Sequence, residues 1–141
     1  MFTLRVDQSE RLILVKHYGA FIGAESVKVG TEILQQVVLS EDMRIFQDMR
    51  ELTEASMVDS DRAYFAIEAG KLSGVSRLKI VRLIDPNNPV STIIEQRRHI
   101  AKDVDKSAKN LFVVYSEAEA RQFLQLPDSY IFHFQFKEFG V

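Results

Sequence analysis

Short apolar runs separated by polar, turn-forming residues recur along the chain. FTLRVD and RLILVKHY are rich in apolar and β-branched residues and are separated by a polar tripeptide, which is typical of two strands joined by a hairpin turn. MRIFQD, RLKIVRLID and NLFVVY follow as further apolar runs of strand length. The pattern therefore predicts an opening antiparallel hairpin followed by three more strands.

Helix signals fall between these runs. Residues 27–38 carry Val27, Ile33, Leu34, Val37 and Val38 at helical spacing after the glycine-bracketed segment GAFIGAES. Capping residues begin later helical segments at Asp59, at Thr92 and at Ser116. The alternation of strands and helices requires crossover connections. It predicts one α/β domain over residues 1–141, with a single mixed, mostly parallel sheet and about four helices.

The C-terminal residues 128–141 form an aromatic, extended tail. Phe132, Phe134 and Phe136 alternate with other side chains in YIFHFQFKEFGV, so an extended backbone places these three rings on one face. Apolar area of this size favours burial. The sequence leaves two outcomes open, which could also hold together: the tail adds an edge strand to its own sheet, or it docks on a second copy and forms a homodimer.

Composition and charge narrow the function classes. The chain of 141 residues is 46% hydrophobic, has no cysteine and has a net charge of −2. We therefore expect a cytoplasmic protein without disulfides. A balanced charge gives no basic surface for nucleic acid, and the apolar runs are far shorter than the roughly 20 residues of a membrane span. We expect neither nucleic-acid binding nor membrane insertion.

Candidate chemistry lies where the parallel strands end. Open α/β sheets bind ligands beyond the carboxyl ends of their strands, where Asp48, Asp85, Tyr115 and Ser116 are expected. For Asp48 a catalytic role competes with a local role, in which the carboxylate stabilises the turn and pairs with Arg50. Asp85 precedes Pro-Asn-Asn-Pro and Ser116 has N-cap spacing, so both have structural explanations. The chain lacks a dinucleotide loop, a P-loop, a nucleophile elbow and histidines at metal-ligand spacing, so no cofactor or metal is expected.

The order of elements, with Asp48-Met49-Arg50 after one strand and NLFVVYSEAEARQFL closing the pattern, resembles the STAS-like (SpoIIAA-like) domains, a bacterial group related to anti-sigma-factor antagonists. The likeness covers about residues 2–126. It implies a regulatory domain that binds another protein. In the phospho-regulated members an Asp-Ser-Ser/Thr-Gly turn follows this strand, whereas Met49, Arg50 and Glu51 stand here, so the phosphorylated serine has no counterpart at that position.

These observations lead to one main functional hypothesis and one alternative. The main hypothesis is a non-enzymatic regulatory module that binds another protein through the loops at the strand ends, including a loop from Asp48 to Asp61. The alternative is a carrier of a small apolar or lipid-like ligand, held between the first two helices and the sheet. An enzyme would instead need the ionisable groups to converge in a cleft. The candidate interaction residues are Asp48, Arg50, Glu51, Ser56, Ser60 and Asp85.

Overall fold

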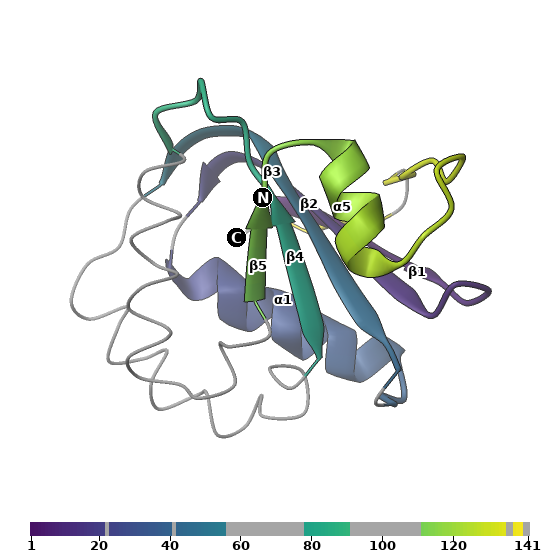
Figure 1. Cartoon of the computed structure of the whole chain (residues 1–141). Helices are drawn as coiled ribbons and strands as arrows, with labels where there is room; N and C mark the ends of the chain where they lie inside the picture. The colour runs from purple at the N-terminus through teal and green to yellow at the C-terminus, as the bar shows by residue number, and fades with distance from the viewer. Residues whose placement is uncertain (22, 41, 56–77, 91–110, 135–136, 140–141) are drawn as a thin grey trace.

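A computed structural model describes residues 1–21, 23–40, 42–55, 78–90, 111–134 and 137–139. Within these residues, six strands form one sheet in the order β5-β4-β3-β2-β1-β6, and two helices pack on it (Figure 1). The elements are β1 (Phe2–Asp7), β2 (Leu12–Phe21), α1 (Gly23–Gln36), β3 (Arg44–Ala55), β4 (Lys79–Leu83), β5 (Leu111–Val114), α5 (Glu117–Leu124) and β6 (Lys137–Phe139).

The sheet is mixed and mostly parallel. β1 pairs antiparallel with β2, and Phe2 lies opposite His17. β2, β3, β4 and β5 then pair in parallel with their neighbours. The predicted hairpin and the predicted crossover topology are confirmed. Of the four predicted helices, the first and last correspond to α1 and α5, and the two between them lie outside the described residues.

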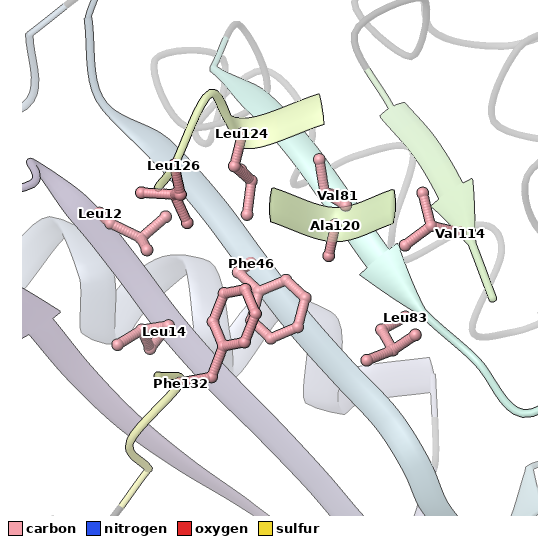
Figure 2. Packing of buried hydrophobic residues seen from close by; sticks show 10 residues of the cluster. All are labelled: Leu12, Leu14, Phe46, Val81, Leu83, Val114, Ala120, Leu124, Leu126 and Phe132. Carbon is pink, nitrogen blue, oxygen red and sulfur yellow. The ribbon is translucent and has the colours of Figure 1, made fainter. Parts of the chain in front are cut away.

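The two described helices cover opposite faces of the sheet (Figure 1). Side chains alternate across a strand, so Ile45 of β3 faces α1 and the next residue, Phe46, faces α5. The cluster on the α1 face contains Phe2, Leu4, Ile13, Val15, Val29, Ile33, Met43, Ile45 and Leu78. The cluster on the α5 face contains Leu12, Leu14, Phe46, Val81, Leu83, Val114, Ala120, Leu124, Leu126 and Phe132 (Figure 2).

The segment GAFIGAES is not the loop that its glycines predict. β2 continues to Phe21, whose side chain is 1% exposed, and α1 begins at Gly23. Gly19 adopts a φ of +67° beside a register shift in the β2–β3 ladder. Glycine adopts this left-handed conformation without a steric penalty, so here it allows an irregular strand to continue.

The apolar positions of the first predicted helix do not all face the core. Ile33 is 1% exposed, but Leu34 is 42% exposed and Val38 is 94% exposed. α1 ends at Gln36, so Val38 lies beyond the helix. Apolar side chains at helical spacing therefore predicted the helix correctly but placed its end too late.

The last described helix begins as its capping pattern predicts. The Ser116 hydroxyl accepts a hydrogen bond from the backbone N–H of Glu119 at 3.1 Å. This satisfies one of the backbone donors that a helix start leaves unpaired. At the other end, Gln125 adopts the left-handed conformation and its N–H bonds back to the last turn. The N-cap interpretation of Ser116 is confirmed.

The tail adds an edge strand, but not at the predicted phenylalanines. β6 pairs antiparallel with β1 over Lys137–Phe139. Phe132 and Phe134 precede it in irregular backbone, and Phe136 lies outside the described residues. The Phe132 ring stacks on Phe46 at a centroid distance of 4.1 Å (Figure 2). This corrects the predicted position of the strand, because burial against Phe46 holds these rings on the sheet face rather than at its edge.

Candidate functional site

The carboxyl ends of the parallel strands form one edge of the sheet, which we call the rim. Its described parts are residues 48–55 of β3, residues 84–90 after β4, and residues 115–117 between β5 and α5. The β3–β4 ladder ends where Asp48 pairs with Leu83. Beyond that rung, β3 continues alongside β2 to Ala55, so much of the predicted loop from Asp48 to Asp61 is strand.

Asp48 is a buried anchor inside β3. Its side chain is 2% exposed, and its Oδ1 accepts hydrogen bonds from the backbone N–H and the Nε of Arg50, both at 3.0 Å. Its Oδ2 accepts from Arg50 Nη2 at 2.8 Å. A bidentate pair of this kind fixes the guanidinium in position and direction. The local pairing of Asp48 with Arg50 is confirmed, and the burial of Asp48 corrects its predicted place on the interaction surface.

An irregularity in the ladder makes this pair possible. Lys16 lies opposite Asp48, but Tyr18 lies opposite Glu51, so β3 contains an additional residue over this stretch. A β-bulge bends the strand and redirects its side chains. Met49 points into a small core cluster and is 3% exposed, while the side chain of Arg50 reaches the surface and is 39% exposed.

Arg50 connects β3 with the start of α5. Its Nη2 lies 3.6 Å from Oε1 of Glu117, in the first turn of that helix. The hydrogen bonds that Arg50 donates to Asp48 raise the pKa of Arg50 above its ordinary value, with the nearby acids acting in the same direction. The guanidinium therefore stays charged and is held between two elements of the rim.

The continuation of β3 presents acids to solvent. Glu51 is 61% exposed at its side chain and lies 2.9 Å from the Nζ of Lys16 on β2. Thr53 and Glu54 are also exposed. Glu51, Glu54 and Glu117 give the described rim more carboxylates than cations at its surface. This surface favours a ligand or partner with basic groups.

The side-chain amide of Asn88 helps to hold the loop after β4 against this strand, beside the packing of Val90 on Leu52. β4 has no residue opposite the backbone carbonyls of Arg50 and Leu52. The Asn88 Nδ2 donates to both, at 3.3 Å and 2.8 Å. Its Oδ1 accepts from the backbone N–H of Val90 at 3.0 Å. The part-buried carbonyl of Leu52 is thereby satisfied, and Asn88 joins residues 50–52 of β3 to residues 84–90 after β4.

Asp85 has the turn role predicted for it. Its Oδ1 accepts from the backbone N–H of Asn87 at 2.9 Å, and its carbonyl accepts from the N–H of Asn88 at 3.0 Å. Hydrogen bonds of an Asp with its own turn are the usual reason for Asp before Pro. Ser56 and Ser60 lie outside the described residues.

A second polar cluster, absent from the sequence expectations, lies on the α1 face. His17 and Glu25 are both 0% exposed, and Nδ1 of His17 lies 2.8 Å from Oε2 of Glu25. Oε1 of Glu25 lies 2.5 Å from the amino nitrogen of Met1. The rings of Phe2 and Phe21 flank the imidazole at centroid distances of 6.1 and 5.2 Å. The cluster joins β2, α1 and the residue before β1.

The electrostatics fix the protonation of this pair. Burial lowers the pKa of His17 and outweighs the opposite effect of Glu25. Burial alone would raise the pKa of Glu25, but the hydrogen bonds from His17 and the amino group of Met1 outweigh it, and the pKa is lowered. Glu25 is therefore ionised and His17 neutral near neutral pH. A carboxylate only accepts hydrogen bonds, so the imidazole proton is on Nδ1. Nε2 of His17 has no partner among the described residues.

Another polar contact lies on the same face. Gln47 of β3 accepts a hydrogen bond from the Nε of Arg82 at 2.6 Å. Gln47 lies two residues after Ile45, and Arg82 two residues after Ile80, which packs on the α1-face cluster. The two-residue period of a strand places both on the α1 face. Arg82 also opposes the protonation of His17 and so helps to lower its pKa.

Part of the apolar face of α1 is filled by the protein's own side chains. Val29 and Ile33 pack with Phe2, Ile13 and Ile45 in the α1-face cluster. The space expected to hold a small apolar ligand also involves the second predicted helix, which lies outside the described residues, so the carrier alternative stays a prediction. In the described parts of the chain, no three His, Cys, Asp or Glu side chains gather as a metal site requires.

None of the helices described here has the length and apolar character needed to span a membrane.

Comparison with protein-family models gave no match, and comparison with curated protein sequences gave none either. Comparison with solved structures did. An uncharacterised protein of the DUF3478 family with a SpoIIAA-like fold, from Shewanella loihica, superimposes with a TM-score of 0.51 over 87% of this chain and 93% of that one, at 12% identity. The chain has a SpoIIAA-like fold. The unphosphorylated anti-sigma factor antagonist SpoIIAA matches with a TM-score of 0.47, at 15% identity, over 89% of this chain and 98% of that one.

This SpoIIAA-like fold confirms the resemblance that was drawn from the order of elements. At 12% identity, the likeness to the Shewanella protein concerns the fold. The fold explains why β2 to β5 are parallel and why their carboxyl ends meet at one rim.

Proposed function

We propose that this protein is a non-enzymatic regulatory module that binds a basic surface of another protein through its rim. The observation that carries the proposal is the Asp48–Arg50 pair: a carboxylate that is 2% exposed holds a guanidinium that is 39% exposed. Burying a charged anchor is costly. The buried carboxylate of Asp48 supports recognition because it fixes the direction of the Arg50 side chain before a partner binds.

The acids around Arg50 define the chemistry of the partner. Glu117 lies 3.6 Å from the guanidinium, Glu51 follows Arg50 on β3, and Glu54 is exposed further along the same strand. Complementary charge steers association and fixes register. A partner with lysines or arginines spaced to meet these carboxylates fits the rim better than an acidic one does.

A binding role accounts for the rim better than a catalytic role does. A general base or nucleophile needs a proton-transfer partner and an open position for the reacting atom. Both oxygens of Asp48 are bonded to Arg50, Asp85 is bonded to its own turn, and the Ser116 hydroxyl caps α5. These groups stabilise structure, and the exposed acids beside them are left for contact with a partner.

We further propose that phosphorylation at the turn after Asp48 does not control this binding. Met49, Arg50 and Glu51 continue β3 at this point, and no hydroxyl occurs among them. Where the phospho-regulated proteins have a serine turn, this chain has the ion pair between Asp48 and Arg50, which does not depend on phosphorylation. The module would then bind its cytoplasmic partner constitutively, or be controlled elsewhere.

Affinity capture with matched charge reversals tests this proposal. Immobilised wild-type protein, the double variant Glu51→Lys/Glu54→Lys, and Asp128→Lys would be exposed to an extract of the source organism. Asp128 is exposed in the tail, near Tyr130, which bonds to Asp7 at the opposite end of the sheet. We expect one stoichiometric protein on the wild type and on Asp128→Lys, lost from the rim variant and weakened by salt. The same bound proteins on all three, or none on the wild type, would contradict the proposal.

A further inference from the structure

β5 lies at the end of the sheet opposite β6. No other described strand pairs with its outer side. The Val114 carbonyl accepts a hydrogen bond from the N–H of Ile84 at 3.0 Å, so Val114 directs its backbone groups towards the rest of the sheet. Alternate residues of a strand point the same way. Phe112 therefore also faces β4, and Leu111 and Val113 direct their backbone N–H and C=O groups outward.

An aromatic patch lies beside this edge. The rings of Phe112 on β5 and Phe123 on α5 are 5.2 Å apart between centroids, and Phe123 is 38% exposed. The Nζ of Lys79 lies 5.6 Å from the centre of the Phe112 ring. An apolar patch beside a strand edge, here one that no other described strand pairs with, is a typical site of strand addition.

We propose that a second copy of this chain pairs with β5, antiparallel and about a two-fold axis, so that the two sheets become continuous. In this arrangement Phe112 lies opposite its own copy, and Leu111 of each chain exchanges backbone hydrogen bonds with Val113 of the other. A two-fold axis perpendicular to the sheet leaves both α5 helices on the same face. The two Phe112–Phe123 pairs then meet and exclude water from each other.

The charges around β5 favour a second copy over a strand of another protein. Lys79 lies beside the start of β5, and Glu117 follows its end. Antiparallel pairing brings the start of one β5 to the end of the other. Lys79 of each chain therefore lies at the same end of the interface as Glu117 of the other chain, so that opposite charges approach. A parallel arrangement would bring like charges together.

The tail does not compete for this role. Phe132 and Phe134 pack against Phe46 on their own sheet, and β6 already pairs with β1. The homodimer that the sequence placed at the tail is therefore assigned here to the opposite edge of the sheet. This inference shares Glu117 with the partner proposed for the rim, and its test measures self-association without that partner.

Sedimentation velocity over a concentration series tests the dimer. We expect the wild type to approach twice the 16.2 kDa of one chain, with a dissociation constant on the order of 10 µM for a small interface. Phe123→Glu should raise this constant at least tenfold, because it places a charge in the aromatic contact. Val113→Pro should do the same by removing an outward N–H that the β4 ladder does not use.

The matched control is Ile131→Glu, which replaces a tail residue that is 65% exposed. It should dimerise like the wild type. Circular dichroism and thermal unfolding show which variants are folded. If Val113→Pro does not fold, Phe123→Glu alone tests the interface. A wild type that remains at 16.2 kDa at about 300 µM, a folded Phe123→Glu that dimerises normally, or dissociation by Ile131→Glu would each overturn the proposal.

Discussion

Two buried carboxylates in the described core, Glu25 and Asp48, have partners of opposite exposure. Glu25 is 0% exposed and contacts His17, which is also 0% exposed. Asp48 is 2% exposed and contacts Arg50, whose side chain is 39% exposed. In the first pair both side chains are buried on the α1 face of the sheet, and Glu25 also contacts the exposed amino group of Met1. The second connects the interior to the surface at the rim.

This difference in exposure predicts different roles: the His17–Glu25 pair contributes to stability, and the Asp48–Arg50 pair also contributes to binding. A buried pair must offset the loss of hydration of both partners by its own contact. The His17–Glu25 pair does this by joining β2 to α1, and its loss should appear as lost stability. In the Asp48–Arg50 pair one partner stays partly hydrated, so its loss should cost less stability and also change what the rim can bind.

The largest effect is expected from Glu25→Ala. It leaves the buried Nδ1–H of His17 without an acceptor and removes a packed side chain, which should lower the free energy of unfolding by roughly 3 kcal/mol. Urea unfolding followed by circular dichroism would measure this change. Glu32→Ala is the control, because Glu32 lies on the same helix and its hydrogen bond from Gln36, within the described part of the chain, is exposed. Equal losses in the two variants would contradict the structural role of the buried pair.

Acid should destabilise the protein through the same pair. The pKa of His17 is lowered from 6.5 and that of Glu25 from 4.5 in the fold, so the unfolded chain binds more protons. Stability then rises with pH. The His17 contribution is complete above about 6.5 and is lost as pH falls below it, and the Glu25 contribution is lost below about 4.5.

Unfolding free energies measured between about pH 7.5 and 5 would test this expectation. His17→Gln should flatten the slope, because the amide keeps a donor for Glu25 but does not titrate in this range. His133→Gln is the control, since His133 is exposed. A wild type whose stability is independent of pH, or rises on acidification, would show that His17 is not held neutral.

A smaller effect is expected from Asp48→Asn. The amide retains one acceptor but loses the charge, which should cost about 2 kcal/mol, the value typical of hydrogen bonds to a charged group. Capture by the rim should also weaken, because Arg50 is no longer fixed. Asp85→Asn is the matched control, since asparagine also stabilises such turns. Full stability in Asp48→Asn would contradict the anchor role of Asp48.

The smallest effect is expected from Glu51→Gln. Its pair with Lys16 is exposed, so the stability change should be about 0.5 kcal/mol or less and should vanish at high salt. Binding by the rim should nevertheless decrease. Thermal unfolding and capture measured on the same samples would show whether stability and recognition separate at this residue. A large loss of stability would show that the rim acid is structural.

Local sequence signals predicted the elements that depend on local interactions. The opening hairpin, the three later strands and the N-cap at Ser116 each follow from neighbouring residues. The second half of β3 was missed because RELTEA is polar, and pairing with β2 holds it in the sheet. The tail was misplaced because the same alternation of phenylalanines suits an edge strand and a segment lying across a sheet face. Only contact with Phe46 decides between them.

The candidate site was predictable in part. The pairing of Asp48 with Arg50 followed from their proximity in sequence, and the turn role of Asp85 followed from the prolines. The His17–Glu25 pair was missed because it joins a strand to a helix. A signal was present: a histidine within an apolar strand, followed by an acid in the first turn of the next helix. Such a histidine needs a buried partner.

Site-specific photocrosslinking in the source organism is the most direct test of the rim as a recognition surface. A crosslinking amino acid would replace Glu54 on the rim or Asp128 in the tail, both of which are exposed. We predict a single major adduct with another protein from position 54 and none from position 128. Adducts from position 128 alone, or from neither position, would contradict the account.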